Sequence, residues 1–131
     1  MIVVDTNVIA YLYLPGEHTA AAEALLRKHG VWAAPALWRS ELRNILALYL
    51  RKRLMTLDSA YRIQREAEGL IGDAEHQVDS LDVLRLATDS GCSAYDCEFV
   101  ALAQHLGVRL VTADAKLRKA FPHDTQSLSG I

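Results

Sequence analysis

Two short apolar runs, each leading into an aspartate, constrain the fold of this chain more than any other feature. Residues 2–4 lead directly into Asp5, and residues 108–111 lead within three positions into Asp114. Residues 2–4 are apolar at every position, which is typical of a strand buried on both faces as in a parallel sheet, and residues 108–111 are apolar except for Arg109. Because the carboxyl ends of parallel strands border the binding crevice of an open sheet, we expect both carboxylates at one site.

Helical patterns separate these runs from further strand candidates. Strands are also expected at residues 31–34 and 77–78, with a small edge strand after Asp124. Helices are expected over residues 6–14, 17–30, 35–53, 57–71, 80–89 and 93–106, with a short one around Leu117. We expect Thr6 or Asn7 to cap the first and Pro35 to begin the third. The alternation predicts a three-layer α/β/α fold with a central, mainly parallel sheet of four to five short strands.

Length and composition favour a single globular domain over residues 1–131. The chain is 51% hydrophobic, enough to bury one core, and its net charge of -2 argues against intrinsic disorder. The two cysteines form no CxxC motif and the five histidines are scattered, so neither a disulfide scaffold nor a zinc site built from these residues is expected. The opening apolar run lacks a basic flank and is interrupted by Asp5 and Asn7, so we expect no secretion signal, no membrane span and a cytoplasmic protein.

Two further carboxylates fall on the apolar sides of predicted helices. At about 100° per residue, Glu41 lies inside an arc formed by Leu37, Trp38, Leu42, Ile45, Leu48 and Tyr49. Asp96 lies at the edge of a second arc, formed by Tyr95, Phe99, Leu102, Ala103 and Leu106. An ionised carboxylate on a buried face is costly unless a positive group compensates it, and a bound cation does so.

Each of the four acids also has a purely structural interpretation. Asp5 and Asp114 can cap the helix or turn that follows each strand. Glu41 can form a salt bridge with a buried arginine, and Asp96 can complete a capping box that begins at Ser93. The functional interpretation rests on their conjunction, because Mg²⁺ and Mn²⁺ prefer oxygen ligands and leave coordination positions for water and phosphate. Four such acids favour phosphodiester hydrolysis assisted by one or two divalent cations.

Basic residues gather in two places, over residues 39–53 and 116–119, whereas acids outnumber them over residues 54–90. A basic end and an acidic end are therefore expected. Arg39, Arg43 and Lys116 are the candidates for contacts with nucleic-acid phosphates, and the alternative is that they lie on ordinary solvated helix faces.

Four segments, VVDTNV, SELRNIL, YDCEFVALAQHLG and LVTADAKL, together resemble the PIN domain, and the small size resembles the VapC toxins of bacterial and archaeal toxin–antitoxin pairs. The resemblance covers essentially the whole chain. It implies that Asp5, Glu41, Asp96 and Asp114 bind Mg²⁺ or Mn²⁺, and that Thr6, Asn7 and Thr112 support them.

The resemblance also implies an activity and partners. These are metal-dependent endoribonuclease activity on structured RNA, a homodimer, and inhibition by a small VapB-like antitoxin. Trp38, Leu42, Leu46 and Tyr49 could form part of an apolar groove for that antitoxin, although an apolar helical stripe is normally core.

Other functions compete with this interpretation. A haloacid-dehalogenase-like phosphotransferase needs a second aspartate two residues after the first, where this chain has Asn7. A receiver domain needs a paired acid and a strand-end lysine, which are not evident. An RNA-processing nuclease of the same fold without an antitoxin, and a non-catalytic RNA- or protein-binding module on that fold, remain as alternatives. A neighbouring gene for a short DNA-binding protein would favour the toxin.

Overall fold

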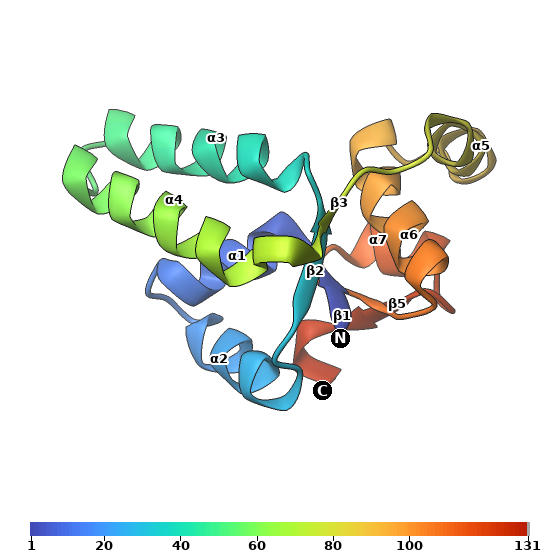
Figure 1. Ribbon diagram of the computed structural model, residues 1–131, viewed down its shortest axis with the longest axis horizontal. Helices are drawn as coiled ribbons and strands as arrows, with labels where there is room; N and C mark the ends of the chain where they lie inside the picture. Colours follow the sequence, from blue (N-terminus) through green and yellow to red (C-terminus); the bar gives the residue numbers. More distant parts are fainter. Residues whose placement is uncertain (131) are drawn as a thin grey trace.

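The computed structural model describes residues 1–130 and contains one five-stranded, wholly parallel sheet (Figure 1). The strand order is β3-β2-β1-β4-β5. The strands are β1 (Ile2–Val4), β2 (Trp32–Pro35), β3 (Glu75–His76), β4 (Leu110–Thr112) and β5 (Thr125–Ser127). The prediction of a mainly parallel sheet of short strands is confirmed, and the tail does add an edge strand.

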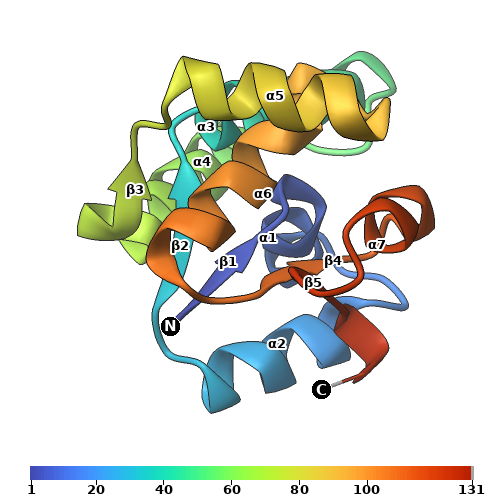
Figure 2. The same ribbon diagram turned by 90° about the vertical axis from the view of Figure 1, so that its right-hand side faces the viewer.

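Helices cover both faces of this sheet, which confirms the three-layer architecture (Figures 1 and 2). One layer contains α1 (Thr6–Tyr13), α2 (Thr19–Lys28), α3 (Trp38–Arg51) and α4 (Leu57–Ile71). The other contains α5 (Ser80–Ser90), α6 (Ala94–Leu106) and α7 (Ala115–Ala120). Two single 3₁₀ turns complete the fold, η1 (Gly72–Ala74) and η2 (Leu128–Gly130).

The direction in which the sheet is built reverses beside β1. The chain first adds β2 and then β3 on one side of β1, and it returns through α5 and α6 to place β4 and β5 on the other side. Such a reversal leaves a crevice at the carboxyl ends of the two strands between which it occurs. Those strands are β1 and β4, which end beside Asp5 and Asp114, so the topology brings the two aspartates to one edge of the sheet.

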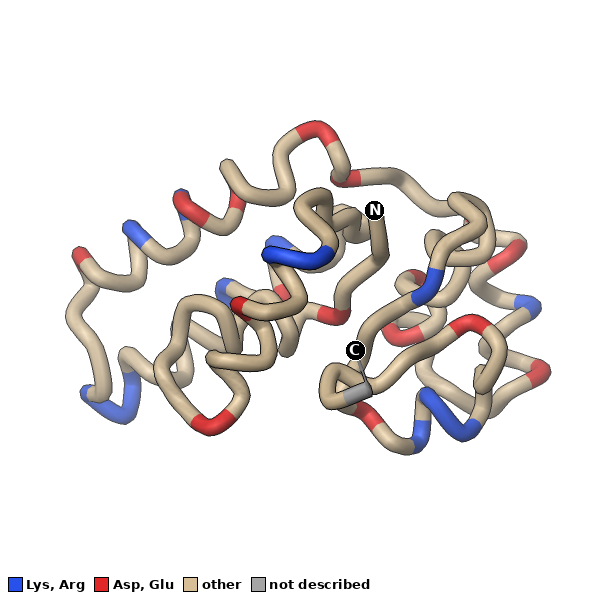
Figure 3. Tube along the Cα trace, turned by 90° about the horizontal axis from the view of Figure 1, so that it is seen from below, with Lys and Arg blue, Asp and Glu red and all other residues tan. Residues whose placement is uncertain are grey.

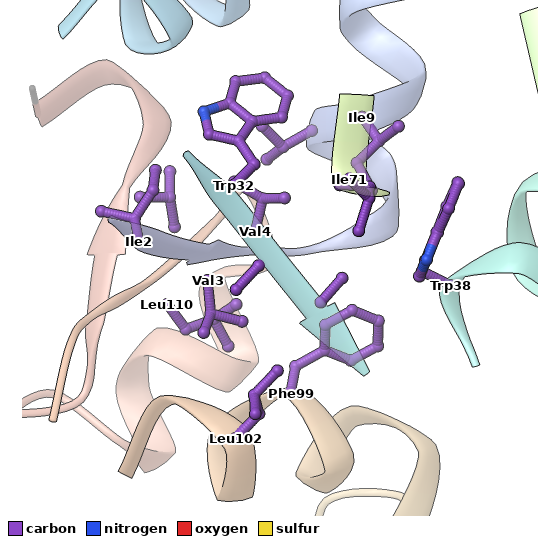
Figure 4. Packing of buried hydrophobic residues seen from close by; sticks show 14 of the residues in the cluster. Ile2, Val3, Val4, Ile9, Trp32, Trp38, Ile71, Phe99, Leu102 and Leu110 are labelled. Carbon is purple, nitrogen blue, oxygen red and sulfur yellow. The ribbon is translucent and has the colours of Figure 1, made fainter. Parts of the chain in front are cut away.

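The core fills the space on both sides of the sheet. Figure 4 shows Trp32 and Ile9 packed on one side of β1 and β2, with Phe99 and Leu102 on the other. Val3 and Val4 are 0% exposed, as expected of a central strand buried on both faces. This rigid centre fixes the positions of the loops that follow each strand.

Several element ends differ from the sequence-based expectation. Pro35 is the last residue of β2 rather than the first of a helix, and α3 begins at Trp38. A proline is tolerated there because the ladder continues past it, with the Ala36 amide donating to the His76 carbonyl at 3.1 Å. The third strand lies at Glu75–His76 instead of residues 77–78.

The distribution of charge also differs from the expectation. Figure 3 shows basic positions both at the far tip of the α3–α4 hairpin and in the half that carries α5, α6 and α7, with acidic positions in both halves. The prediction of a basic end and an acidic end is therefore wrong. Within residues 1–130, no helix combines the length and the apolar character needed to cross a membrane.

Candidate active site

All four predicted carboxylates line one open cleft of about 440 Å³ at the carboxyl edge of the sheet. They come from four places in the chain: the end of β1, the first turn of α3, the first turn of α6 and the residue before α7. The complete lining is Asp5, Thr6, Asn7, Leu37, Ser40, Glu41, Asn44, Ile45, Tyr95, Asp96 and Asp114.

Asp5 is fixed by two hydrogen bonds. Its Oδ1 accepts from the Asn7 amide at 3.1 Å, which caps α1, and its Oδ2 accepts from Thr112 Oγ1 at 2.6 Å. Burial raises the pKa of the Asp5 carboxyl, the two hydrogen bonds oppose this rise, and the charges of Asp96 and Asp114 add to it. Capping and membership of the site are thus compatible for this residue, and Asp5 rather than Thr6 or Asn7 is the cap.

Glu41 lies in the first turn of α3 and accepts a hydrogen bond from Thr6 Oγ1 at 2.7 Å. Burial raises the pKa of its carboxyl, the Thr6 hydroxyl lowers it, and the charges of Asp5 and other nearby acids raise it further. The salt-bridge interpretation is wrong, because no basic side chain in the described part of the chain pairs with Glu41.

Asp96 forms only half of the capping box that its sequence suggested. Its backbone amide donates to Ser93 Oγ at 3.0 Å, which caps α6. The reciprocal bond, in which the Ser93 amide would donate to the Asp96 carboxylate, is not formed among residues 1–130. The carboxylate instead borders the cleft without a protein partner there.

Asp114 caps α7 and also borders the cleft. Its Oδ1 accepts from the amides of Lys116 at 2.9 Å and Leu117 at 3.3 Å. Its own amide donates to Thr112 Oγ1 at 3.0 Å, the same hydroxyl that donates to Asp5. The fully buried Thr112 therefore ties the end of β1 to the end of β4.

The donor set fits a hard divalent cation. Glu41, Asp96 and Asp114 each keep a carboxylate oxygen that has no hydrogen bond within residues 1–130, and that part of the chain brings no compensating arginine or lysine pair to them. Burial and neighbouring negative charges raise the pKa values of Asp5 and Glu41. A bound cation would offset both the cost of burying the ionised carboxylates and their mutual repulsion.

In the conformation described, however, no three carboxylate, imidazole or thiolate groups of residues 1–130 lie close enough together to chelate one ion. Three of the four acids are turned toward protein donors: Asp5 toward Thr112, Glu41 toward Thr6, and Asp114 toward the start of α7. Like charges also repel one another, so these side chains have to close around a cation that binds.

Two groups of predicted residues lie elsewhere. Arg39 does not line the cleft, and its guanidinium pairs with Glu68 at 2.9 Å and with Glu75 at 2.6 Å, so its contact with phosphate stays a prediction. Arg43 donates to Ser40 Oγ at 3.3 Å, and Lys116 is exposed beside Asp114.

Three members of the predicted antitoxin groove belong to the core instead, which confirms the alternative interpretation of that stripe. Trp38 and Leu42 are 0% exposed and Leu46 is 3% exposed, whereas Tyr49 is partly exposed beside the cleft.

Sequence reasoning missed Ser40, Asn44 and Tyr95, which also line the cleft. The available signal was the position of Asn44, which lies three residues after Glu41 and four after Ser40, since residues three and four apart share a helix face. Tyr95 directly precedes Asp96, but its exposed ring was assigned to an apolar core arc.

Comparisons with known proteins identify a family and a relative of the chain. The family model described as "PIN domain" matches residues 2–121. Ribonuclease VapC3 of Pyrobaculum aerophilum is 32% identical over 124 residues, which cover 92% of this chain and 95% of that protein.

Solved structures share the fold at lower identity. The FitAcB crystal structure from Neisseria gonorrhoeae superimposes with a TM-score of 0.79 at 19% identity, covering both chains completely. A toxin–antitoxin complex from Klebsiella pneumoniae gives a TM-score of 0.75 at 16% identity, again over the whole of both chains.

Proposed function

The chain belongs to the PIN domain family, as a VapC-type ribonuclease, and we propose that it hydrolyses RNA phosphodiester bonds at a divalent-cation site formed by Asp5, Glu41, Asp96 and Asp114. The observation that carries the proposal is the convergence of four carboxylates from separate elements on one cleft at the point where the sheet reverses. A concave surface lined by acids that lack salt-bridge partners repels RNA unless a cation is bound. The acids that cause this repulsion therefore also call for a cation as the cofactor.

Mg²⁺ or Mn²⁺ held there would supply the positive charge that offsets the substrate phosphate and lowers the pKa of water. Residues of the protein orient the carboxylates and the attacking water. Thr112 and Thr6 orient Asp5 and Glu41 through their hydroxyls. Asp96, whose carboxylate accepts no hydrogen bond within residues 1–130, is the group available to orient water or accept its proton.

We further propose that the chain is the toxin of a type II toxin–antitoxin pair, that it forms a homodimer, and that a VapB-like antitoxin inhibits it. The identity to a VapC ribonuclease over nearly the whole chain supports this role, and the toxin–antitoxin complex from Klebsiella pneumoniae provides a structural parallel. We expect coexpression with the cognate antitoxin to suppress any growth defect that the chain causes alone.

The direct test is a cleavage assay on total cellular RNA with wild type and Asp96→Asn, each in Mg²⁺, in Mn²⁺ and in EDTA. Asp89→Asn is the matched control, because Asp89 is an exposed aspartate on α5 outside the cleft. We expect discrete fragments from wild type and Asp89→Asn with metal, and none from Asp96→Asn or in EDTA. Cleavage by Asp96→Asn equal to wild type would remove the proposed site, and an inactive wild type free of inhibitor would favour a binding module.

A further inference from the structure

A second cavity of about 270 Å³ adjoins the carboxylate cleft. It lies between α1, the loop that follows it and α3, and it shares Asn7 and Ile45 with the cleft. Because the same two residues border both spaces, the cavity and the cleft are immediate neighbours, and a ligand longer than one nucleotide can contact both.

Three of the ten residues that line the second cavity carry aromatic rings. Tyr11, His18 and Tyr49 line it, and the Tyr11 and His18 rings are tilted by 33° with their centroids 4.4 Å apart. The His18 side chain is 46% exposed and the two tyrosines are partly exposed, so none of these rings is fully sequestered in the core. Flat aromatic faces open to solvent are what unstacked bases of single-stranded RNA bind.

The charges of the residues that line the cavity favour an uncharged base over a phosphate as its ligand. The lining contains no lysine or arginine among the described residues, and apart from its two tyrosines its titratable members are Glu17 and His18, which lie 3.5 Å apart. A phosphate therefore meets no permanently positive side chain there and meets the Glu17 carboxylate, whereas an uncharged planar base meets no charge repulsion.

Asn7 gives this cavity a polar edge. Its backbone amide is used by Asp5, but its side-chain amide makes no hydrogen bond within residues 1–130. A side-chain amide offers both a donor and an acceptor, which is the combination that reads the edge of a base.

We infer that this cavity is a nucleobase subsite, in which the base of a nucleotide adjacent to the scissile phosphate stacks on Tyr11 or Tyr49 with its edge toward Asn7. The inference rests on the proposed function, because a base is brought to the second cavity by the phosphate that lies in the carboxylate cleft. Such a subsite would give the proposed nuclease a source of sequence preference, which the carboxylates of the cleft do not provide.

The test is a binding measurement that does not depend on cleavage. Fluorescein-labelled RNA octamers of A, U or C are titrated in Mg²⁺ against Asp96→Asn protein, and Kd is read by fluorescence anisotropy. Tyr49→Ala and Tyr11→Ala are added to this background, with Tyr49→Phe to preserve the ring and Tyr61→Ala as the matched control. Tyr61 is 61% exposed on α4 and borders neither space.

We expect at least one of Tyr11→Ala and Tyr49→Ala to raise Kd by about 5- to 150-fold, the range that stacking of one base provides. Tyr49→Phe and Tyr61→Ala should leave it within about twofold. An octamer with abasic sugars should bind weakly and should not distinguish the variants.

Three results would overturn the inference. Equal Kd values for Tyr11→Ala, Tyr49→Ala and Tyr61→Ala would show that no base stacks in this cavity and would leave the nuclease proposal intact. Variants that keep RNA affinity but lose affinity for the purified antitoxin would assign the cavity to a protein partner. Absence of RNA binding and of cleavage in wild type would remove the subsite together with the proposed function.

Discussion

The four carboxylates of the cleft fall into two pairs that the protein holds differently. In the inner pair, Asp5 and Glu41, each carboxylate accepts a hydrogen bond from a buried threonine hydroxyl. In the outer pair, Asp96 has no protein partner for its carboxylate among residues 1–130, and Asp114 is held only by backbone amides at the start of α7.

This contrast indicates that the two pairs have different roles in the cleft. Burial raises the pKa of both inner carboxyls, so holding them ionised has a cost that the threonine hydroxyls offset in part. The outer pair keeps oxygens free and can adjust toward a ligand. We therefore propose that the inner pair determines where a cation binds and that the outer pair completes its coordination.

The largest expected effect comes from removing an inner charge. Asp5→Asn should abolish detectable RNA cleavage, a loss of at least about 100-fold and more than the removal of a residue that only orients a metal ligand usually costs. The same change should raise the Tm in EDTA by a few degrees, because it removes a partly buried charge that neighbouring acids repel. Asp96→Asn should abolish cleavage with a smaller gain in Tm. Equal Tm gains for both variants, measured by differential scanning fluorimetry, would contradict the contrast between the pairs.

Removing the threonine that orients Asp5 should have the next largest effect. Thr112→Val keeps the shape but loses the hydroxyl that donates to Asp5 and accepts from the Asp114 amide. We expect a loss of about 1–3 kcal/mol in the free energy of unfolding and a 10- to 100-fold loss of cleavage. Thr112→Ser should recover most of both. A valine variant with wild-type cleavage would show that the hydroxyl does not orient the site.

The raised pKa values of the inner pair predict a pH dependence of stability without metal. Because folding raises these pKa values above 3.8 for Asp5 and 4.5 for Glu41, the folded state binds their protons more tightly. Their contribution is fully present below the unfolded pKa values and is lost as pH rises through the folded ones. Urea unfolding in EDTA from pH 4 to 8 should therefore show wild type losing stability relative to Asp5→Asn/Glu41→Gln.

Addition of Mg²⁺ at pH 7.5 should restore that stability in wild type and not in the double variant, since the cation replaces the lost protons. A constant difference between the two proteins across the pH range would mean that burial of the inner pair carries no penalty.

The smallest expected effect concerns the anchor of α3, which carries Glu41. Glu75 Oε1 accepts from Trp38 Nε1 at 2.7 Å and from Arg39 Nε at 2.6 Å, tying the start of α3 to β3. Glu75→Gln should cost about 1 kcal/mol of unfolding free energy and less than a tenfold loss of cleavage. Glu68→Gln, which removes only one contact to Arg39, should cost less than Glu75→Gln. The reverse order, measured by urea unfolding, would contradict this assignment of the anchor.

The sequence predicted the site better than it predicted the details around it. Asp5 and Asp114 follow predicted strands, and Glu41 interrupts a clear apolar arc, so the conjunction of these patterns predicted acids that line one cleft. The ion pairs of Arg39 could not be predicted, because its partners, Glu68 and Glu75, lie on other elements and become neighbours only after α3 packs against α4 and β3. Pro35 was misplaced for a similar reason, since the ladder to β3 decides where the helix begins.

The aromatic cavity could not have been predicted from any single segment. Tyr11 and Tyr49 lie in helices whose patterns read as ordinary amphipathic faces, and only the packing of α1 against α3 places them at one opening. Sites made by one strand end are visible in a sequence, whereas sites made between elements depend on the fold.

The most direct test of the central claim is isothermal titration of Mn²⁺ into wild type and into Asp5→Asn, Glu41→Gln, Asp96→Asn and Asp114→Asn, with Asp89→Asn as control. If the four carboxylates form one cation site, wild type and control bind with the same Kd, and each of the four variants weakens binding at least about tenfold. Equal Mn²⁺ affinity in wild type and all four variants would contradict the claim, because the acids would then share a cleft without sharing a ligand.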